Sequence, residues 1–272
     1  MIISDKHQFA FIHIPKSAGS TVRHALMSLD ERREQYYDRS RAEHPVLGAL
    51  DHAHIPLAVL AEHFSADLAL LREYRAYALL RDPLTRFESS LHEYVRTRTG
   101  GLLADLSPVE QRSNIATVLD LLGQHGNAPV TNPALIHFAR QSDYIELDGE
   151  RIVDGLYLLE HVGQMLDDIE ERVGEPLPRK DRNRRVEYSS PILASASGAV
   201  QRGLRRLLPA SVTGPMFGLA KRGLLATGAA STLKSSAPEA LPDAEIEAFV
   251  REFYARDFVL RNEVKQAGPP TN

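Results

Sequence analysis

The feature that most constrains the fold of this chain is a short apolar run that ends in a loop of small and polar residues. Residues 9–14 (FAFIHI) are mostly apolar, which is typical of a buried strand in a parallel sheet. Pro15 ends this run, and apolar residues with helical spacing then extend from Val22 to Leu29. The order of strand, tight loop and helix predicts an α/β unit whose loop lies at the carboxyl end of a strand, where such folds bind ligands.

Residues 16–21 (KSAGST) fill this loop and begin the helix. The backbone N–H groups at a helix N-terminus point toward one position, and the helix dipole adds about half a positive charge there. Lys16 adds a full positive charge, and hydroxyl donors follow at Ser17, Ser20 and Thr21. We therefore predict an anion-binding loop. It is not a Walker A motif, because no glycine stands four residues before a Gly-Lys-Ser/Thr sequence.

A second unit of the same kind follows along the chain. Residues 75–80 (RAYALL) predict another buried strand, and residues 81–83 (RDP) end it before a helix over residues 84–95. Arg81, at the strand end, can make a paired contact with a phosphate, and Ser89, in the first turns of the helix, can reach the same group. Two such units predict a parallel sheet with an anion site at the carboxyl ends of its strands.

The rest of the chain predicts further helices and one more strand. Apolar spacing predicts a third strand at 155–159, helices at 57–64, 162–173 and 242–264, and a helical region at 105–140 with a break at 123–129.

Composition narrows the class of protein. The chain has 272 residues, of which 43% are hydrophobic and 25% charged, so we expect one globular domain or one domain with an appended module. The net charge of −4 gives no general attraction to nucleic acid, so the anion site must be local. The absence of cysteine excludes disulfides, thiolate nucleophiles and Cys-ligated zinc. Neither a signal peptide nor a membrane-spanning run is evident, and the chain starts directly at its first strand; we expect a cytoplasmic protein.

Residues 189–238 differ from the rest in composition. They are rich in Ala, Ser, Gly and Leu, and no acidic residue lies between Glu187 and Glu239. Their charged residues are all positive: Arg202, Arg205, Arg206, Lys221, Arg222 and Lys234. We predict a basic, helical insertion within a single domain of residues 1–272. It binds the acceptor substrate, lies on an anionic membrane surface through residues 200–234, or forms a partly ordered cap.

Two motifs together resemble those of a known family. Residues 13–21 (HIPKSAGST) resemble the 5′-phosphosulfate loop of the membrane-type carbohydrate sulfotransferases, sulfotransferase family 2, and residues 81–89 (RDPLTRFES) resemble their 3′-phosphate motif. The resemblance covers most of residues 7–190. It implies that 3′-phosphoadenosine 5′-phosphosulfate (PAPS) is the sulfuryl donor, bound by Arg81 and Ser89 at its 3′-phosphate. Arg86 positions the loop or contacts the nucleotide. The loop residues that bind its 5′ end are Lys16, Ser17, Ala18, Gly19, Ser20 and Thr21.

The resemblance also bears on the base and on a lid over the nucleotide. A histidine element lies between the two family motifs, and in residues 51–54 (DHAH) His54 aligns best with its last histidine, with His52 the second choice. Ala53 replaces the common glycine. Residues 180–184 (KDRNR) are similar to a basic loop that closes over the nucleotide through Lys180 and Arg184, although a solvated basic loop explains them as well.

The fold implied is a three-layer α/β sandwich with a central parallel sheet of about five strands, built like a P-loop kinase. The activity implied is direct, in-line transfer of a sulfuryl group to a hydroxyl of a carbohydrate-type acceptor, a glycan or glycolipid, leaving adenosine 3′,5′-bisphosphate. Lys16 neutralises the leaving oxygen, and no metal or nucleic acid is required. Two alternatives remain: a P-loop-type nucleotide or metabolite kinase, and a non-catalytic nucleotide-binding protein. The missing Walker A motif disfavours the first, and the intact Lys16, Arg81 and Ser89 disfavour the second.

Overall fold

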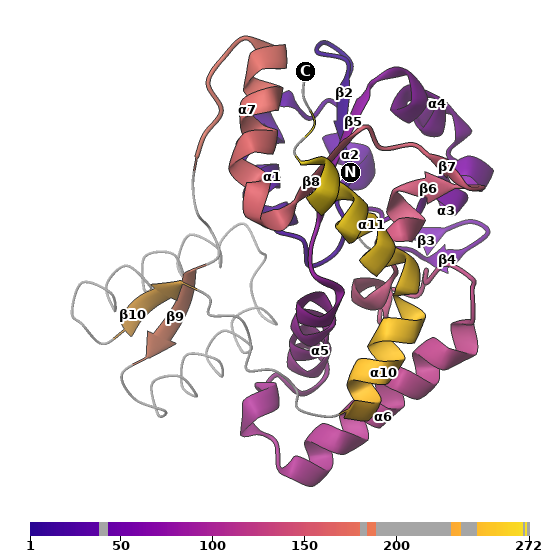
Figure 1. Ribbon diagram of the computed structural model, residues 1–272, viewed down its shortest axis with the longest axis vertical. Coiled ribbons are helices and arrows are strands. Elements are labelled where there is room, and N and C mark those ends of the chain that lie inside the picture. Colours follow the sequence, from indigo (N-terminus) through magenta and orange to yellow (C-terminus); the bar gives the residue numbers. More distant parts are fainter. Residues whose placement is uncertain (38–42, 180–183, 189–229, 235–243, 269, 271–272) are drawn as a thin grey trace. The chain divides into compact units, whose positions relative to one another are not determined.

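The computed structural model describes residues 1–37, 43–179, 184–188, 230–234, 244–268 and 270 (Figure 1). The chain divides into two compact units, Met1–Lys180 with Glu239–Asn272, and Asp181–Pro238. The first unit carries both predicted anion loops.

A four-stranded sheet lies at the centre of the first unit, in the order β1 (Ile2–Ser4), β2 (Phe9–Phe11), β5 (Arg75–Leu80) and β8 (Gly155–Leu158). Strands β2, β5 and β8 are parallel, as predicted, whereas β1 pairs antiparallel with β2 at the edge, so the sheet is mostly parallel. The described residues give this sheet four strands where we expected about five. Strand β1 was missed because three residues are too few to show a periodicity.

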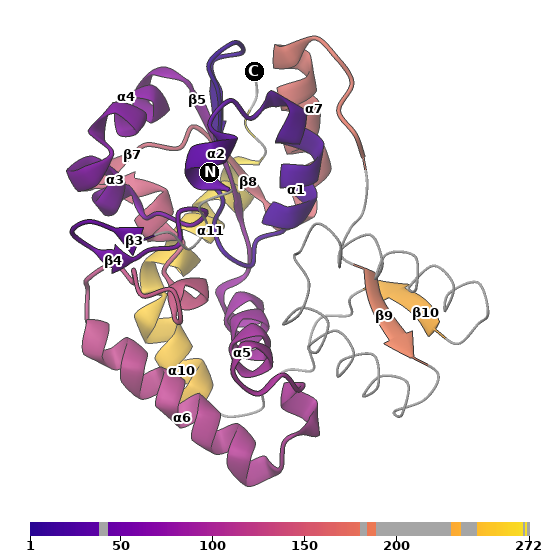
Figure 2. The ribbon, with the colours of Figure 1, turned by 180° about the vertical axis from the view of Figure 1, so that it is seen from behind.

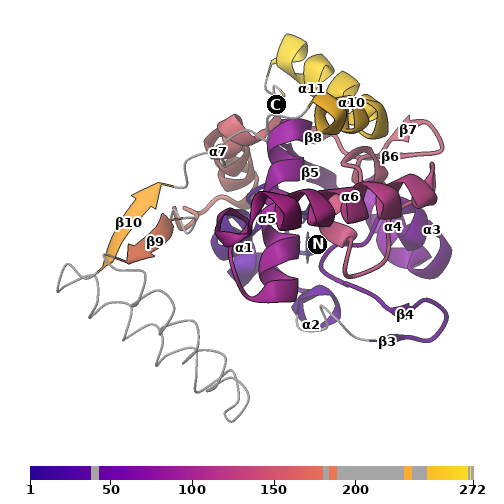
Figure 3. The ribbon, with the colours of Figure 1, turned by 90° about the horizontal axis from the view of Figure 1, so that it is seen from below.

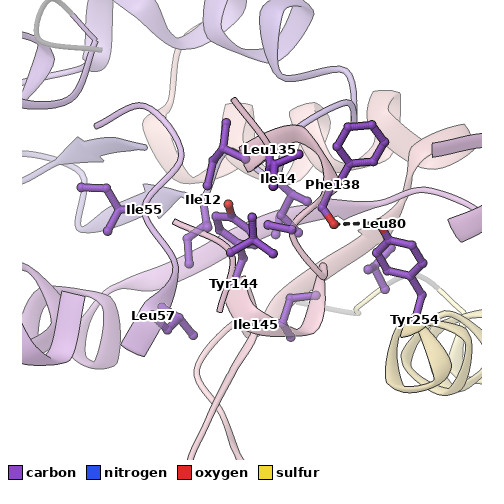
Figure 4. Close-up of a cluster of buried hydrophobic side chains, with 14 of the residues drawn as sticks. Ile12, Ile14, Ile55, Leu57, Leu80, Leu135, Phe138, Tyr144, Ile145 and Tyr254 are labelled. Atoms are coloured by element: carbon purple, nitrogen blue, oxygen red, sulfur yellow. Dashed lines mark hydrogen bonds between the residues drawn. The ribbon is translucent and has the colours of Figure 1, made fainter. Parts of the chain in front are cut away.

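Alternate residues of these strands enter two separate hydrophobic clusters. Phe9, Phe11 and Tyr77 pack with α1 (Gly19–Leu26) and α7 (Val162–Val173). The intervening strand residues, such as Ala10 and Leu80, pack into a larger cluster with the remaining long helices. Figure 4 shows part of this cluster, with Leu80 and Tyr254 among its side chains. The sheet is therefore covered by helices on both faces, as Figure 3 shows from below.

The larger cluster gathers helices from distant parts of the chain (Figure 2). They are α3 (Leu57–His63), α4 (Ser65–Glu73), α5 (Pro83–Thr99), α6 (Pro108–His125), α10 (Ala244–Phe253) and α11 (Ala255–Ala267). One short α-helix is α2 (Arg33–Tyr36). The 3-10 turns are η1 (Met27–Leu29), η2 (Leu103–Asp105), η3 (Ile136–Phe138), η4 (Ser142–Tyr144) and η5 (Leu159–His161). Two short antiparallel ribbons pair β3 (Glu43–His44) with β4 (Gly48–Ala49) and β6 (Glu146–Leu147) with β7 (Glu150–Arg151).

Two predicted helices differ from the structure. The region expected to be helical over 105–140 is helical only to His125, and η3 follows the expected break. The final helix, expected to be continuous, is interrupted at Tyr254, whose backbone is non-helical (φ −106°, ψ 25°). The Tyr254 side chain is fully buried and donates a hydrogen bond to the carbonyl oxygen of Phe138 over 2.7 Å (Figure 4). Tertiary contacts of this residue override the helical pattern.

The second unit contains an antiparallel pair of strands, β9 (Arg184–Tyr188) and β10 (Ala230–Lys234). Residues 230–234 lie within the predicted helical insertion but form a strand. Most of the basic residues of this insertion, from Arg202 to Arg222, lie outside the described residues.

Candidate functional site

The lysine loop, residues 15–18, leads into α1 through two left-handed backbone conformations. Lys16 has a φ of 64° and Ala18 a φ of 56°. The loop closes on the helix through bonds from Thr21 N (2.9 Å) and Val22 N (3.3 Å) to the carbonyl oxygen of Ala18. The first turn of α1, which begins at Gly19, has no acidic side chain, so nothing in it neutralises the positive end of the helix dipole. These backbone conformations and this helix start are compatible with the predicted anion cradle.

The side chains predicted to bind the nucleotide's 5′ end differ in exposure. Ser17 is buried, whereas Ser20 is exposed, and Thr21 and Ala18 are partly exposed. Gly19 is buried against the ring of His13: a Cβ at this position would lie 1.6 Å from the His13 Nε2 atom. Only glycine fits while His13 keeps its place.

The second loop lies beside the first because β2 and β5 are adjacent and parallel. Asp82 is the N-cap of α5 and accepts hydrogen bonds from Leu84 N (3.1 Å) and Thr85 N (3.2 Å), with Pro83 at the first helical position. The Asp-Pro pair thus starts the helix. It leaves Arg81 at the strand end, where its Nη1 donates to the carbonyl oxygen of Lys16 over 3.1 Å. The two motifs predicted to bind the cofactor are in direct contact.

Lys16 has an acidic neighbour on α5. Its Nζ lies 3.6 Å from Glu93 Oε2, and Glu93 also pairs with Arg96. Burial lowers the pKa of Lys16, and Glu93 opposes this by favouring the charged ammonium. Glu93 therefore partly offsets the effect of burial on the Lys16 ammonium.

Arg86 lies inside the fold. Its side chain is 0% exposed, and its guanidinium donates to the carbonyl oxygens of His137 (3.2 Å) and Ala139 (2.6 Å) and lies over the ring of Tyr254. Of the two roles predicted for Arg86, this geometry favours positioning. Ser89, on the same helix, is partly exposed, whereas its neighbour Ser90 is buried and donates to the carbonyl oxygen of His137 over 2.6 Å.

The histidine segment, residues 51–54, is held in place by several hydrogen bonds. Asp51 Oδ1 accepts from Ala53 N over 3.0 Å, and His54 N donates to Asp51 O over 3.0 Å. Tyr144 donates to the carbonyl oxygen of His54 over 3.2 Å. The segment is therefore fixed from more than one side.

The rings of the two candidate bases point to different places. The His54 ring lies 4.3 Å from the His13 ring and 5.8 Å from the His137 ring, whereas the His52 ring contacts Phe64 at 6.0 Å. Through His13, which packs on the start of α1, His54 adjoins the lysine loop. The structure thus connects His54 to the start of α1 through His13, whereas the contact seen for the His52 ring is with Phe64.

Burial sets the protonation of this cluster. It lowers the pKa of His54 to about 3 and that of His13 well below its ordinary value. The Nδ1 atom of His54 lies 2.9 Å from the carbonyl oxygen of His13. A carbonyl can only accept, so Nδ1 carries the proton and Nε2 keeps a lone pair. His54 can therefore accept a proton at Nε2.

Two residues of this region carried no signal in the sequence. His137 had no context that raised it above the other histidines, yet its ring lies beside that of His54. Gln141 is 0% exposed and hydrogen-bonds the backbone of Arg81. Neither residue stands in a motif, and each reaches the site from far along the chain.

The predicted lid over the nucleotide stays a prediction. Lys180 lies outside the described residues, and Arg184 belongs to β9 of the second unit. Among the described residues, no group of three or more His, Asp or Glu side chains is arranged to hold a metal. Within the same part of the chain, no helix has both the length and the apolar character to cross a membrane.

Comparison with known proteins gives one match. Residues 1–98 match the model of the sulfotransferase family. No curated protein and no solved structure matches the chain. The matched region contains the lysine loop, the histidine segment and the arginine motif up to Ser89, and it ends within α5.

Proposed function

Since residues 1–98 match the model of the sulfotransferase family, we propose that the chain transfers the sulfuryl group of PAPS to a hydroxyl of a carbohydrate-type acceptor. The family supports sulfuryl transfer as the chemistry. The observation that carries the choice of donor is the contact between the two anion loops, in which Arg81 Nη1 donates to the carbonyl oxygen of Lys16 over 3.1 Å. A nucleotide with phosphates at both its 5′ and its 3′ ends suits two adjacent cationic loops.

The residues present fit such a donor. The loop backbone and the start of α1 offer N–H groups and a positive dipole end to the 5′ side. Lys16 is the cation that neutralises charge on the leaving oxygen. Arg81 and Ser89 would bind the 3′-phosphate, and the buried Arg86 would position the loop. We also propose that the helices on the two faces of the sheet form the three-layer, P-loop-kinase-like sandwich that the resemblance implies.

His54 is the proposed general base, with His52 the weaker candidate. The acceptor hydroxyl gives its proton to His54 Nε2 as its oxygen bonds to the sulfur, and the bond from the sulfur to the phosphate oxygen breaks in the same in-line step. Because Nδ1 donates to the carbonyl of His13, the ring is held in the tautomer that can accept this proton. No covalent enzyme intermediate is needed.

Donor choice is tested by thermal stabilisation. A ligand that binds only the native state, present at a concentration of 100 times its Kd, stabilises that state by about 2.7 kcal/mol. We expect adenosine 3′,5′-bisphosphate to raise the Tm, and ATP with magnesium to raise it far less. The reverse result would reject the sulfotransferase proposal in favour of the kinase alternative. Binding of the bisphosphate without turnover on any acceptor would favour a non-catalytic nucleotide-binding protein.

The acceptor is tested by a screen of glycans, glycolipids and small hydroxylated metabolites with radiolabelled sulfuryl donor. The support for a glycan or glycolipid is the resemblance alone. For the basic residues 200–234, we propose acceptor binding or peripheral membrane contact. Co-sedimentation with anionic liposomes, with and without these residues, separates the two: negligible binding by both proteins would reject membrane contact. A cytoplasmic location stays a prediction.

A further inference from the structure

Gln141 lies between the two anion loops and is completely buried. Its Oε1 accepts a hydrogen bond from Arg81 N over 2.9 Å and lies 3.5 Å from the hydroxyl of Ser17, and its Nε2 donates to Arg81 O over 2.9 Å. We propose that Gln141 is a positioning residue that sets the spacing of the two loops and so the affinity for the sulfuryl donor. This inference rests on the proposed function, because it assumes that both loops hold one nucleotide.

The amide is suited to this place because it offers a donor and an acceptor at once. The N–H and the carbonyl group of Arg81 both hydrogen-bond to this one side chain, as they would to the backbone of a neighbouring strand. Ser17, on the other loop, is 1% exposed and turns its hydroxyl to the same Oε1. Neither a carboxylate nor an apolar side chain of this size makes all three contacts.

Gln141 is itself held by the C-terminal helix. Asp257, at the start of α11, is 0% exposed, and its carboxylate accepts from Gln141 N over 2.8 Å and from Ser142 N over 2.9 Å. Arg86 Nη2 lies 3.9 Å from the same carboxylate and also binds the carbonyl oxygen of Ala139. Two buried charges therefore fix the backbone that carries the amide.

This support comes from outside the region that matches the family. The matched residues end at 98, whereas Gln141 and Asp257 lie 60 and 176 positions beyond Arg81. Arg81 in turn contacts the carbonyl oxygen of Lys16. A chain of contacts thus runs from α11 through Gln141 to the arginine loop and on to Lys16.

The first test measures the Kd for adenosine 3′,5′-bisphosphate by calorimetry on the full chain. Gln141→Met keeps the side-chain volume and removes the amide, which leaves both Arg81 main-chain groups without this partner. We expect a Kd at least about tenfold weaker than that of the unaltered protein. Tyr36→Phe is the matched control: it removes a buried hydrogen bond to Asp67 (2.6 Å) between α2 and α4, elements that carry neither loop, and should leave the Kd unchanged.

The second test uses the chemistry of the amide itself. In Gln141→Glu, a protonated carboxyl group reproduces both the donor and the acceptor, whereas the carboxylate faces the carbonyl oxygen of Arg81. We expect the Kd of this variant to lie within about threefold of the unaltered protein at pH 5.5 and to be at least about tenfold weaker at pH 8. The unaltered protein, measured at the same pH values, corrects for titration of the ligand.

The outcomes separate this inference from the function on which it rests. Tight binding by both the unaltered protein and Gln141→Met overturns the inference and leaves the proposed function standing. The absence of binding by the unaltered protein overturns both. The ratio of the Kd of Gln141→Glu to that of the unaltered protein should change with pH. If this ratio is the same at both pH values, the positioning role is overturned, because only a general loss of packing would be independent of the ionisation of this one group.

Discussion

At the scale of single residues, the proposed reaction depends on the protonation state of His54. Its ring is neutral because burial lowers its pKa to about 3, and its free lone pair is on Nε2 because Nδ1 donates to the carbonyl of His13. A base that starts neutral can take a proton directly. The negative charge of a bound donor would raise the pKa of His54 and strengthen it as a base.

His54→Ala should therefore separate binding from transfer. We expect unchanged affinity for adenosine 3′,5′-bisphosphate and a loss of about 10²–10⁴-fold in kcat, the usual contribution of a general base. The matched control is His52→Ala, whose ring packs on Phe64 and should be dispensable for turnover. Calorimetry and a radiolabelled transfer assay measure the two effects. Turnover by His54→Ala at the rate of the unaltered enzyme would remove this residue from the mechanism.

Glu93 makes a second prediction at this scale. Its carboxylate lies 3.6 Å from the Lys16 ammonium, where it competes with an incoming anion. A partly exposed ion pair contributes about 0.2–1 kcal/mol, so Glu93→Gln should tighten binding of adenosine 3′,5′-bisphosphate by about 1.5- to 5-fold. The exposed Glu252, on α10, supplies the control Glu252→Gln for the loss of one negative charge. Equal or weaker binding by Glu93→Gln would show that the carboxylate does not compete.

At the scale of elements, the start of α1 is constrained by one close approach. A methyl group at Gly19 would overlap the ring of His13, which lies against His54. Gly19→Ala should therefore lower stability by about 1–3 kcal/mol and weaken nucleotide binding. Gly163→Ala, in α7, is the control: a Cβ there meets nothing within 4 Å, and alanine favours a helix by about 1 kcal/mol. Urea denaturation and calorimetry compare them, and equal behaviour would mean that His13 moves freely.

The same scale explains what could be predicted from the sequence. Strand β5, helix α7 and the two loops were predictable because each is a local pattern: an apolar run, a 3.6-residue period, or a short motif next to a strand end. The break at Tyr254 was not, because it depends on a buried hydrogen bond to Phe138. Gln141 and His137 were missed for the same reason. Gln141 hydrogen-bonds Arg81, which lies 60 residues away in the sequence, and the ring of His137 lies beside that of His54. No local sequence pattern encodes such contacts.

At the scale of the whole molecule, the buried titratable groups act on stability in opposite directions. His13 and His54 have lowered pKa values in the fold, so their contribution is complete above pH 6.5 and is lost as the pH falls. Burial raises the pKa of Asp143 to about 7. Its contribution is present below its ordinary pKa of 3.8 and is lost as the pH rises toward 7. Between pH 4 and 6.5, therefore, the two histidines make the fold more stable as the pH rises, and the Asp143 carboxyl makes it less stable.

This balance predicts how variants change the pH profile of unfolding. Each group changes the slope of the free energy of unfolding against pH by at most about 1.4 kcal/mol per pH unit. Asp143→Asn removes the opposing group, so the free energy of unfolding should rise more steeply from pH 5 to 7, and the variant should be more stable than the unaltered protein at pH 8. His54→Asn should make the same rise shallower. Urea denaturation at pH 5, 6, 7 and 8 measures both slopes. If Asp143→Asn ran parallel to the unaltered protein, Asp143 would titrate alike in the folded and unfolded chains, and its burial beside Asp257 would carry no electrostatic penalty.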